Sequence, residues 1–148
     1  LGIDLAEAAL REARKRAAAA GDEIAARAEF IRVDAVRPSL LGRRFGAVVD
    51  SGFLHVLEPD QRAVFIDELA RSLLPGGRYY LQAFAVDFPL PNTPLRVTEE
   101  EVRERFGDGD TWRILALRQR EFTSRMAPVP ATLACIERLP PAGVDDGE

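Results

Sequence analysis

Three aspartates, Asp4, Asp34 and Asp50, each directly follow a short apolar run that has the composition of a β-strand. In an open parallel sheet, ligands bind beyond the carboxyl ends of the strands, and acids at those ends lie along one edge. A carboxylate there can accept hydrogen bonds from ribose hydroxyls or from an amino group. The positions of the three acids therefore predict a binding edge for a ribose-containing ligand.

The chain has one histidine, His55, shortly after Asp50. An imidazole with a pKa near ~6.5 can take a proton from an attacking nucleophile, so His55 is a candidate general base. The alternative is a histidine packed among its apolar neighbours, residues 54–57. The apolar run before Asp50 predicts a buried carboxylate that needs a partner. Cys135 stands in another apolar run and is expected to be an inert core thiol, and no Cys, His and acid cluster supports a metal site.

The elements that must position these residues alternate between strand and helix. Apolar positions at a spacing of four, such as Phe65 and Leu69, predict a helix that Pro75 to Gly77 ends. Thr98 and Glu101 form a predicted capping box. Helices are expected over residues 5–20, 59–74 and 98–106, and strands over 2–4, 29–33, 47–49, 78–84, 112–117 and 131–136. The pattern predicts an α/β fold: Rossmann-like, doubly wound, with a mostly parallel sheet and a C-terminal antiparallel hairpin.

Composition limits the classes of partner and the domain organisation. We expect one domain over residues 1–139 and a flexible acidic tail over 140–148. The net charge is −4 and the 20 basic residues are spread along the chain, which argues against a nucleic-acid surface. No apolar run approaches the ~20 residues of a membrane-spanning helix. A single cysteine favours a reducing compartment, so we expect a cytoplasmic protein.

The order of these motifs resembles that of class I S-adenosylmethionine-dependent methyltransferases, from the second strand of that family to its last. Gly2 to Leu5 is similar to the end of the second strand, where the family's acid binds both ribose hydroxyls. Asp34-Ala35 is similar to the end of the third strand. There the family's aspartate accepts from the adenine amino group, and the next backbone N–H reaches a ring nitrogen.

Two further segments carry the resemblance. Phe45 to Ser51 resembles the fourth strand, whose tip faces the methionine part of the cofactor and the substrate, and Leu74 to Arg78 resembles the turn before strand five. Asp50 to His55 is most similar to the thiopurine-methyltransferase-like, small-molecule branch. The family's first strand, which lies at the centre of the sheet, and its glycine-rich loop have no counterpart in this sequence.

The resemblance implies S-adenosylmethionine as cofactor and methyl transfer to an O, N or S nucleophile of a small molecule. It implies His55 as the catalytic base, the cofactor's ammonium as the partner of Asp50, and six cofactor-binding residues: Asp4, Leu5, Asp34, Ala35, Asp50 and Ser51. One alternative is a nicotinamide-dependent oxidoreductase, whose ribose is also held by an acid after strand two. The other is a non-catalytic, degenerate Rossmann-like domain that forms a homodimer through unpaired sheet edges.

Overall fold

The computed structural model describes residues 1–91, 93–107, 109–123 and 127–141, so most of the expected tail, residues 142–148, lies outside the described residues. The described residues contain the expected helices and strands in the expected order, with one additional α-helix, α2, and two short 3₁₀ helices, η1 and η2. The elements are β1 (Gly2–Asp4), α1 (Glu7–Ala19), α2 (Asp22–Arg27), β2 (Phe30–Arg32), η1 (Pro38–Leu41), β3 (Phe45–Ser51), η2 (Leu54–Val56), α3 (Pro59–Ser72), β4 (Leu73–Phe84), α4 (Glu99–Phe106), β5 (Trp112–Thr123) and β6 (Pro128–Arg138).

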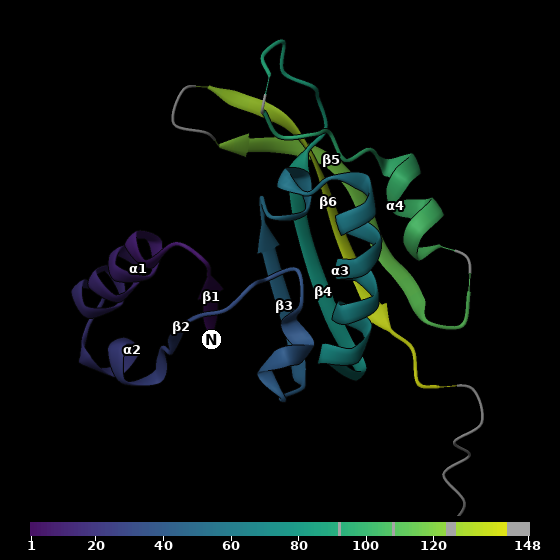
Figure 1. Ribbon diagram of the computed structural model, residues 1–148. Coiled ribbons are helices and arrows are strands. Elements are labelled where there is room, and N and C mark those ends of the chain that lie inside the picture. Colours follow the sequence, from purple (N-terminus) through teal and green to yellow (C-terminus); the bar gives the residue numbers. More distant parts are fainter. Residues whose placement is uncertain (92, 108, 124–126, 142–148) are drawn as a thin grey trace, which may run out of the picture.

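The strands form two sheets (Figure 1). β1 and β2 make a short parallel pair, and the second sheet has the order β3-β4-β6-β5. In it β3 and β4 are parallel, whereas β6 is antiparallel to both β4 and β5. The α/β class and the terminal antiparallel hairpin are confirmed. The expectation that Asp4, Asp34 and Asp50 follow strands of one sheet is wrong, because no described strand pairs with both β1 and β3.

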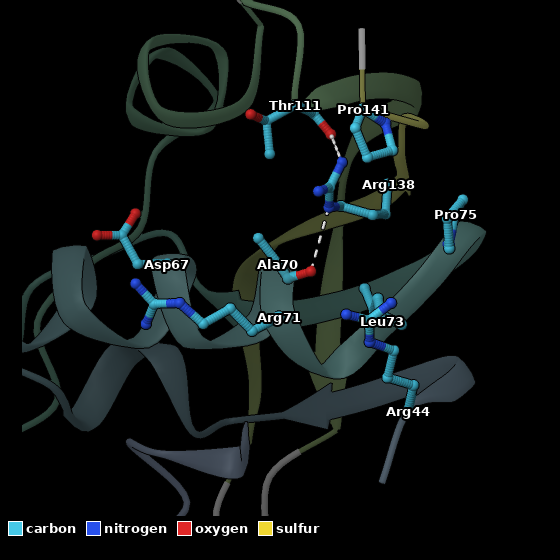
Figure 2. Close-up of a pocket in the computed structure, with 9 residues that line it drawn as sticks. All are labelled: Arg44, Asp67, Ala70, Arg71, Leu73, Pro75, Thr111, Arg138 and Pro141. Carbon is cyan, nitrogen blue, oxygen red and sulfur yellow. Dashed lines mark hydrogen bonds between the residues drawn. The ribbon is translucent and has the colours of Figure 1, made fainter. Parts of the chain in front are cut away.

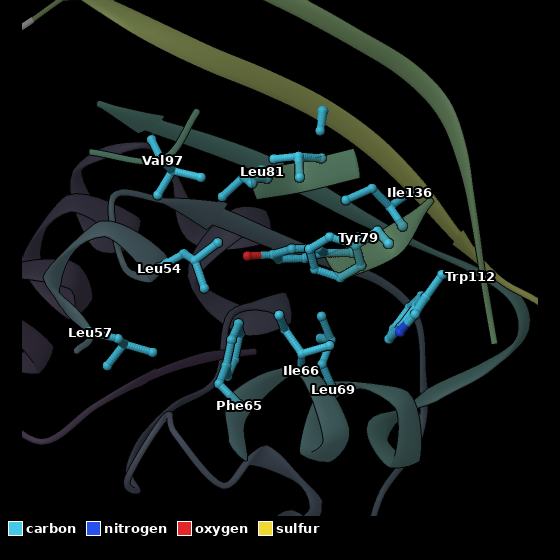
Figure 3. Packing of buried hydrophobic residues seen from close by; sticks show 14 of the residues in the cluster. Leu54, Leu57, Phe65, Ile66, Leu69, Tyr79, Leu81, Val97, Trp112 and Ile136 are labelled. Atoms are coloured by element: carbon cyan, nitrogen blue, oxygen red, sulfur yellow. The ribbon is translucent and has the colours of Figure 1, made fainter. Parts of the chain in front are cut away.

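The core lies between the four-stranded sheet and helices α3 and α4, which cover one of its faces (Figure 1). The apolar stripe of α3 supplies Phe65 and Leu69, and β4 contributes Tyr79 and Leu81 from alternate positions (Figure 3). Burial of one large apolar side chain contributes about 1.5–3 kcal/mol, so this stripe anchors α3 to the sheet.

The opposite face of the sheet carries exposed apolar side chains. Val49 on β3 is 77% exposed and Tyr80 on β4 is 39% exposed. Cys135 pairs with Tyr80 in the β4–β6 register and is half-buried. The expectation of a core thiol is therefore wrong, because the strand's alternation turns Cys135 away from the face that α3 covers.

The predicted cap of α4 forms only in part. The backbone N–H of Glu101 donates to the Thr98 hydroxyl at 3.1 Å, as an N-cap requires. The Glu101 carboxylate binds the guanidinium of Arg62 on α3 instead of returning to the backbone of Thr98. A tertiary ion pair thus replaces one half of the expected capping box.

The irregular first part of β4, directly after α3, depends on two glycines. Gly76 has a φ of +76°, a conformation that favours glycine. A Cβ at Gly77 would lie 2.8 Å from the carbonyl oxygen of Leu74 and 3.1 Å from that of Phe45. The backbone of β3 therefore comes close to this part of β4 because residue 77 has no side chain.

We expect Gly77→Ala to destabilise the protein by about 1–3 kcal/mol, the range for overpacked sites, because backbone carbonyls cannot move aside as side chains can. Urea unfolding measures the free energy. Gly46→Ala is the matched control, since a Cβ on Gly46 of the same strand pair would meet nothing within 4 Å. Equal losses in the two variants would contradict this account of Gly77.

Candidate active site

Asp4 is the last residue of β1 and Asp34 lies two residues after β2, and the two aspartates form the same kind of turn. Oδ1 of Asp4 accepts the backbone N–H of Ala6 at 2.7 Å, and Oδ1 of Asp34 accepts that of Val36 at 3.0 Å. Each aspartate thus closes a turn onto the residue two positions on. Closing such a turn is a common structural role for aspartate, but it uses only one oxygen of each carboxylate. Within the described residues the second oxygens have no hydrogen-bond or ion-pair partner.

The residues next to these acids leave further groups available. No hydrogen bond of the described chain uses the backbone N–H of Ala35. Leu5 is 56% exposed beside Asp4, and its carbonyl accepts from Nε of Arg32 at 3.0 Å. The carboxyl ends of β1 and β2 therefore present one free oxygen on each of the two aspartates, the backbone N–H of Ala35 and the apolar side chain of Leu5.

Asp50 is enclosed by donors of its own chain and is only 5% exposed. Its Oδ1 accepts the N–H of Phe53 at 2.6 Å, and its Oδ2 accepts the N–H of Leu54 at 3.0 Å and the hydroxyl of Tyr79 at 2.7 Å. Burial raises the pKa of Asp50, and these hydrogen bonds act in the opposite direction. The partner that a buried carboxylate needs is thus supplied internally, which removes the reason for expecting the cofactor's ammonium there.

His55 lies on η2 at the carboxyl end of β3, near Ser51, and is 5% exposed. Its Nδ1 accepts the backbone N–H of Phe84 at 3.0 Å, and its ring stacks on the Phe84 ring at a centroid distance of 4.4 Å. Because Nδ1 is the acceptor, the neutral ring carries its proton on Nε2. Burial, with a smaller contribution from Arg62, lowers the pKa of His55 to about 4. This geometry argues against the expected general base and makes Nε2–H a hydrogen-bond donor.

Arg62 of α3 fastens the segment before α4 to this region. It is 3% exposed and pairs with Glu101 at 2.7 Å. It also donates to the carbonyls of Leu57, Leu95 and Arg96. The N–H of Leu95 in turn donates to the His55 carbonyl at 2.7 Å. A buried guanidinium thus sets the position of the segment that follows β4.

Three residues of this region escape the sequence-based prediction of the site: Tyr79, Arg62 and Phe84. For Arg62 a signal exists, since it stands three and four residues before Phe65 and Ile66, on the apolar stripe of α3. For Tyr79 the signal is the alternation with Leu81 and Ala83, opposite Gln82. For Phe84 the sequence holds no signal, because its contact with His55 joins residues 29 positions apart.

A hollow of about 400 Å³ lies at the opposite end of the four-stranded sheet (Figure 2). It is lined by Arg44, Asp67, Ala70, Arg71, Leu73, Pro75, Thr111, Arg138 and Pro141. Arg138 donates to the carbonyl of Ala70 at 3.1 Å and so caps the C-terminus of α3. Arg71 lies in the last turn of α3. Positive side chains are favourable at the negative end of a helix, which accounts for Arg71 and Arg138 without a ligand.

Within the described residues, no group of three or more His, Cys, Asp and Glu side chains could hold a metal ion. None of the described helices is long and apolar enough to cross a membrane.

Comparison with known proteins assigns the family. The model of a family described as methyltransferase domain matches residues 1–77, more than half of the 148-residue chain. The chain belongs to this family. The match agrees with the resemblance to methyltransferases and leaves the nicotinamide-dependent alternative without support.

Solved structures share the fold. An S-adenosylmethionine-dependent methyltransferase from Methanosarcina mazei has a TM-score of 0.74 at 22% identity, with 93% of this chain and 81% of that chain covered. A protein from a study of thioacetal formation in echinomycin biosynthesis has a TM-score of 0.73 at 24% identity, with 93% and 65% covered. The Burkholderia thailandensis 1,6-didemethyltoxoflavin-N1-methyltransferase, crystallised with 1,6-didemethyltoxoflavin and S-adenosylhomocysteine, has a TM-score of 0.67 at 21% identity, with 93% and 60% covered. The chain thus has the fold of S-adenosylmethionine-dependent methyltransferases and spans 65% of the echinomycin-pathway protein.

We expect Tyr79→Phe to lower the free energy of unfolding by about 1–3 kcal/mol, because it removes a donor from the buried Asp50 carboxylate. Tyr80→Phe on the uncovered face is the matched control, with an expected change within about 0.5 kcal/mol. Urea unfolding of both variants at pH 7 gives the comparison. Similar losses would show that the Tyr79 hydroxyl does not support Asp50.

His55 should make stability depend on pH. Its folded-state pKa of about 4 lies below its unfolded value, so the unfolded chain takes up the proton first as the pH falls. The contribution of neutral His55 to the free energy of unfolding is complete above pH ~6.5. It is lost progressively as the pH falls to about 4, and the total loss is at most about 3 kcal/mol. Urea unfolding of the unsubstituted protein and of His55→Gln is measured at pH 7.5, 6 and 5. The difference between their free energies of unfolding isolates His55, because the other titrating groups are common to both proteins. A pH-independent difference would contradict the lowered pKa.

Proposed function

We propose that this chain belongs to an enzyme that transfers a methyl group from S-adenosylmethionine to an O, N or S nucleophile of a small molecule. Family membership and the shared fold support the reaction class. The finer assignment to the thiopurine-methyltransferase-like branch stays a prediction, as does a cytoplasmic location.

One observation carries the proposal: the matched geometry of Asp4 and Asp34 at the carboxyl ends of β1 and β2. Each turn holds Oδ1 and leaves Oδ2 available. In the proposed complex, Oδ2 of Asp4 accepts from the ribose hydroxyls and Oδ2 of Asp34 accepts from the adenine amino group. The unused N–H of Ala35 donates to a ring nitrogen, and the exposed side chain of Leu5 covers part of the adenine. The donors and acceptors available here fit an adenosine moiety.

The chain's residues position the reactants. When bound, S-adenosylmethionine supplies a methyl group that the positive sulfonium has already activated, so that in-line placement of the acceptor is the main requirement. Asp50 is occupied by its own chain and serves to hold η2 and the backbone at Ser51 in place. His55 keeps its proton on Nε2, and this N–H can donate a hydrogen bond to the molecule that receives the methyl group and so orient it. A proton released by the acceptor leaves to solvent in this scheme, since Nδ1 of His55 is already in use.

We expect Asp4→Asn in the full-length protein to weaken binding of S-adenosylhomocysteine about 10- to 100-fold. This range corresponds to a lost hydrogen bond to a charged group, about 1.5–3 kcal/mol. Asparagine keeps the acceptor for the Ala6 N–H, so the turn and the start of α1 should survive. Isothermal titration calorimetry measures the affinity, and circular dichroism checks the fold.

Asp60→Asn is the matched control, because Asp60 is an exposed acid in the first turn of α3. Its affinity should equal that of the unsubstituted protein. Unchanged affinity in Asp4→Asn would reject the ribose role. A full-length protein that gives no binding heat and forms dimers in light scattering would favour the non-catalytic, dimerising domain.

A further inference from the structure

Gly52 leaves Nε2 of His55 accessible. Gly52 has a φ of +95°, and a Cβ there would lie 3.2 Å from Nε2 and 3.1 Å from Cε1. Within the described residues Nε2 has no hydrogen-bond partner, although the His55 side chain is only 5% exposed. No fully buried polar side-chain atom of those residues lacks a partner, so Nε2 is not completely enclosed. A donor without a partner on a mostly buried ring thus lies next to Gly52.

Three phenylalanine rings form a cluster beside His55. Phe84 stacks on His55 with 3° between the ring planes, and Phe122 of β5 lies 6.4 Å from His55 and 4.9 Å from Phe84. Phe88 meets Phe84 edge to face at 5.2 Å. All three phenylalanines are only partly buried: Phe84 ends β4, Phe88 follows four residues later, and Phe122 belongs to β5. Rings in such a group can stack with, or make edge contacts to, a further aromatic ring.

Apart from Arg120 and Glu121 on β5, which are exposed and have no ion-pair partner among the described residues, the charged side chains nearest to this cluster are paired. Asp87 binds Arg96 at 2.6 Å, and Arg62 binds Glu101 at 2.7 Å. Asp50 is held by its three donors, and His55 is neutral at pH 7 because burial lowers its pKa to about 4. These groups therefore offer no unpaired charge to a ligand, which favours a neutral molecule.

Building on the proposed function, we infer that the methyl acceptor is a neutral aromatic or heteroaromatic molecule. It places a ring carbonyl or another hydrogen-bond acceptor on Nε2–H of His55 and packs its ring against Phe84, Phe88 and Phe122. A site built around a fixed donor discriminates strongly against analogues that lack the matching acceptor. His55 in this assignment is a residue that selects and orients the acceptor.

The test uses 4-hydroxyquinoline, which in water presents a ring carbonyl on a flat heteroaromatic frame. The full-length protein is labelled with ¹⁵N-histidine, and the His55 imidazole is identified by the signal lost in His55→Gln. We expect the free protein to show a protonated Nε2 and an unprotonated Nδ1. Added 4-hydroxyquinoline should shift the Nε2–H signal downfield, whereas the saturated analogue 1-decalone, which is neutral and keeps a ring carbonyl, should bind at least about 10-fold more weakly.

Phe122→Leu should weaken binding of 4-hydroxyquinoline about 3- to 10-fold, the yield of one aromatic contact. Phe45→Leu at the amino end of β3 is the matched control and should leave it unchanged. Equal binding of the saturated analogue, or an unmoved Nε2–H signal at saturation, would overturn the inference. Parallel titration with S-adenosylhomocysteine separates the two proposals. Cofactor binding without a His55 response rejects only the aromatic acceptor. A His55 response without cofactor binding rejects the methyltransferase function and shows an aromatic-ligand site whose ligand is not a methyl acceptor.

Discussion

The buried carboxylate of Asp50 gathers three donors at the end of β3, and the arrangement of the candidate site depends on it. Two of the donors are backbone N–H groups at the start of η2, and the third is the hydroxyl of Tyr79 on β4. Because η2 begins in this way, His55 is carried to the end of β4, where its Nδ1 accepts the N–H of Phe84. Asp50 thus joins the turn after β3 to Tyr79 of β4, and His55 joins the same turn to Phe84. Partners on both oxygens also explain how a carboxylate can remain in an apolar setting.

A second buried group, Arg62, extends this arrangement to the segment between β4 and α4. Its guanidinium spans from the end of η2 to the carbonyls of Leu95 and Arg96 and to Glu101. Removal of one partner from such a pair leaves an uncompensated charge, so the pair imposes one arrangement on the segment. Asp50 and Arg62, whose hydrogen-bond partners lie within the chain, therefore hold in place the segments that carry the aromatic cluster beside His55.

Local sequence signals predicted the elements well. The apolar spacing of α3, the Thr98 cap and the apolar runs before the acids all depend on near neighbours, and the structure has each of them. The Asx-type turns at Asp4 and Asp34 are local for the same reason. The division into two sheets, the partners of Asp50 and the tautomer of His55 depend on contacts between distant residues. Asp50 and Tyr79 are 29 positions apart, as are His55 and Phe84. Periodicity shows that such residues are buried, but it does not show which of them meet.

The strand order β3-β4-β6-β5 has a consequence for how the chain folds during synthesis. β6 is the last of the described strands, yet it lies between β4 and β5, so β5 has no neighbour in the described sheet until β6 has left the ribosome. Until then the second edge of β4 is also unpaired, and open edges readily pair with other chains. Strand pairing of this kind is slow, because distant segments must meet before they gain stability. The emerging chain therefore exposes the unpaired edges of β4 and β5 until residues near Arg138 become available.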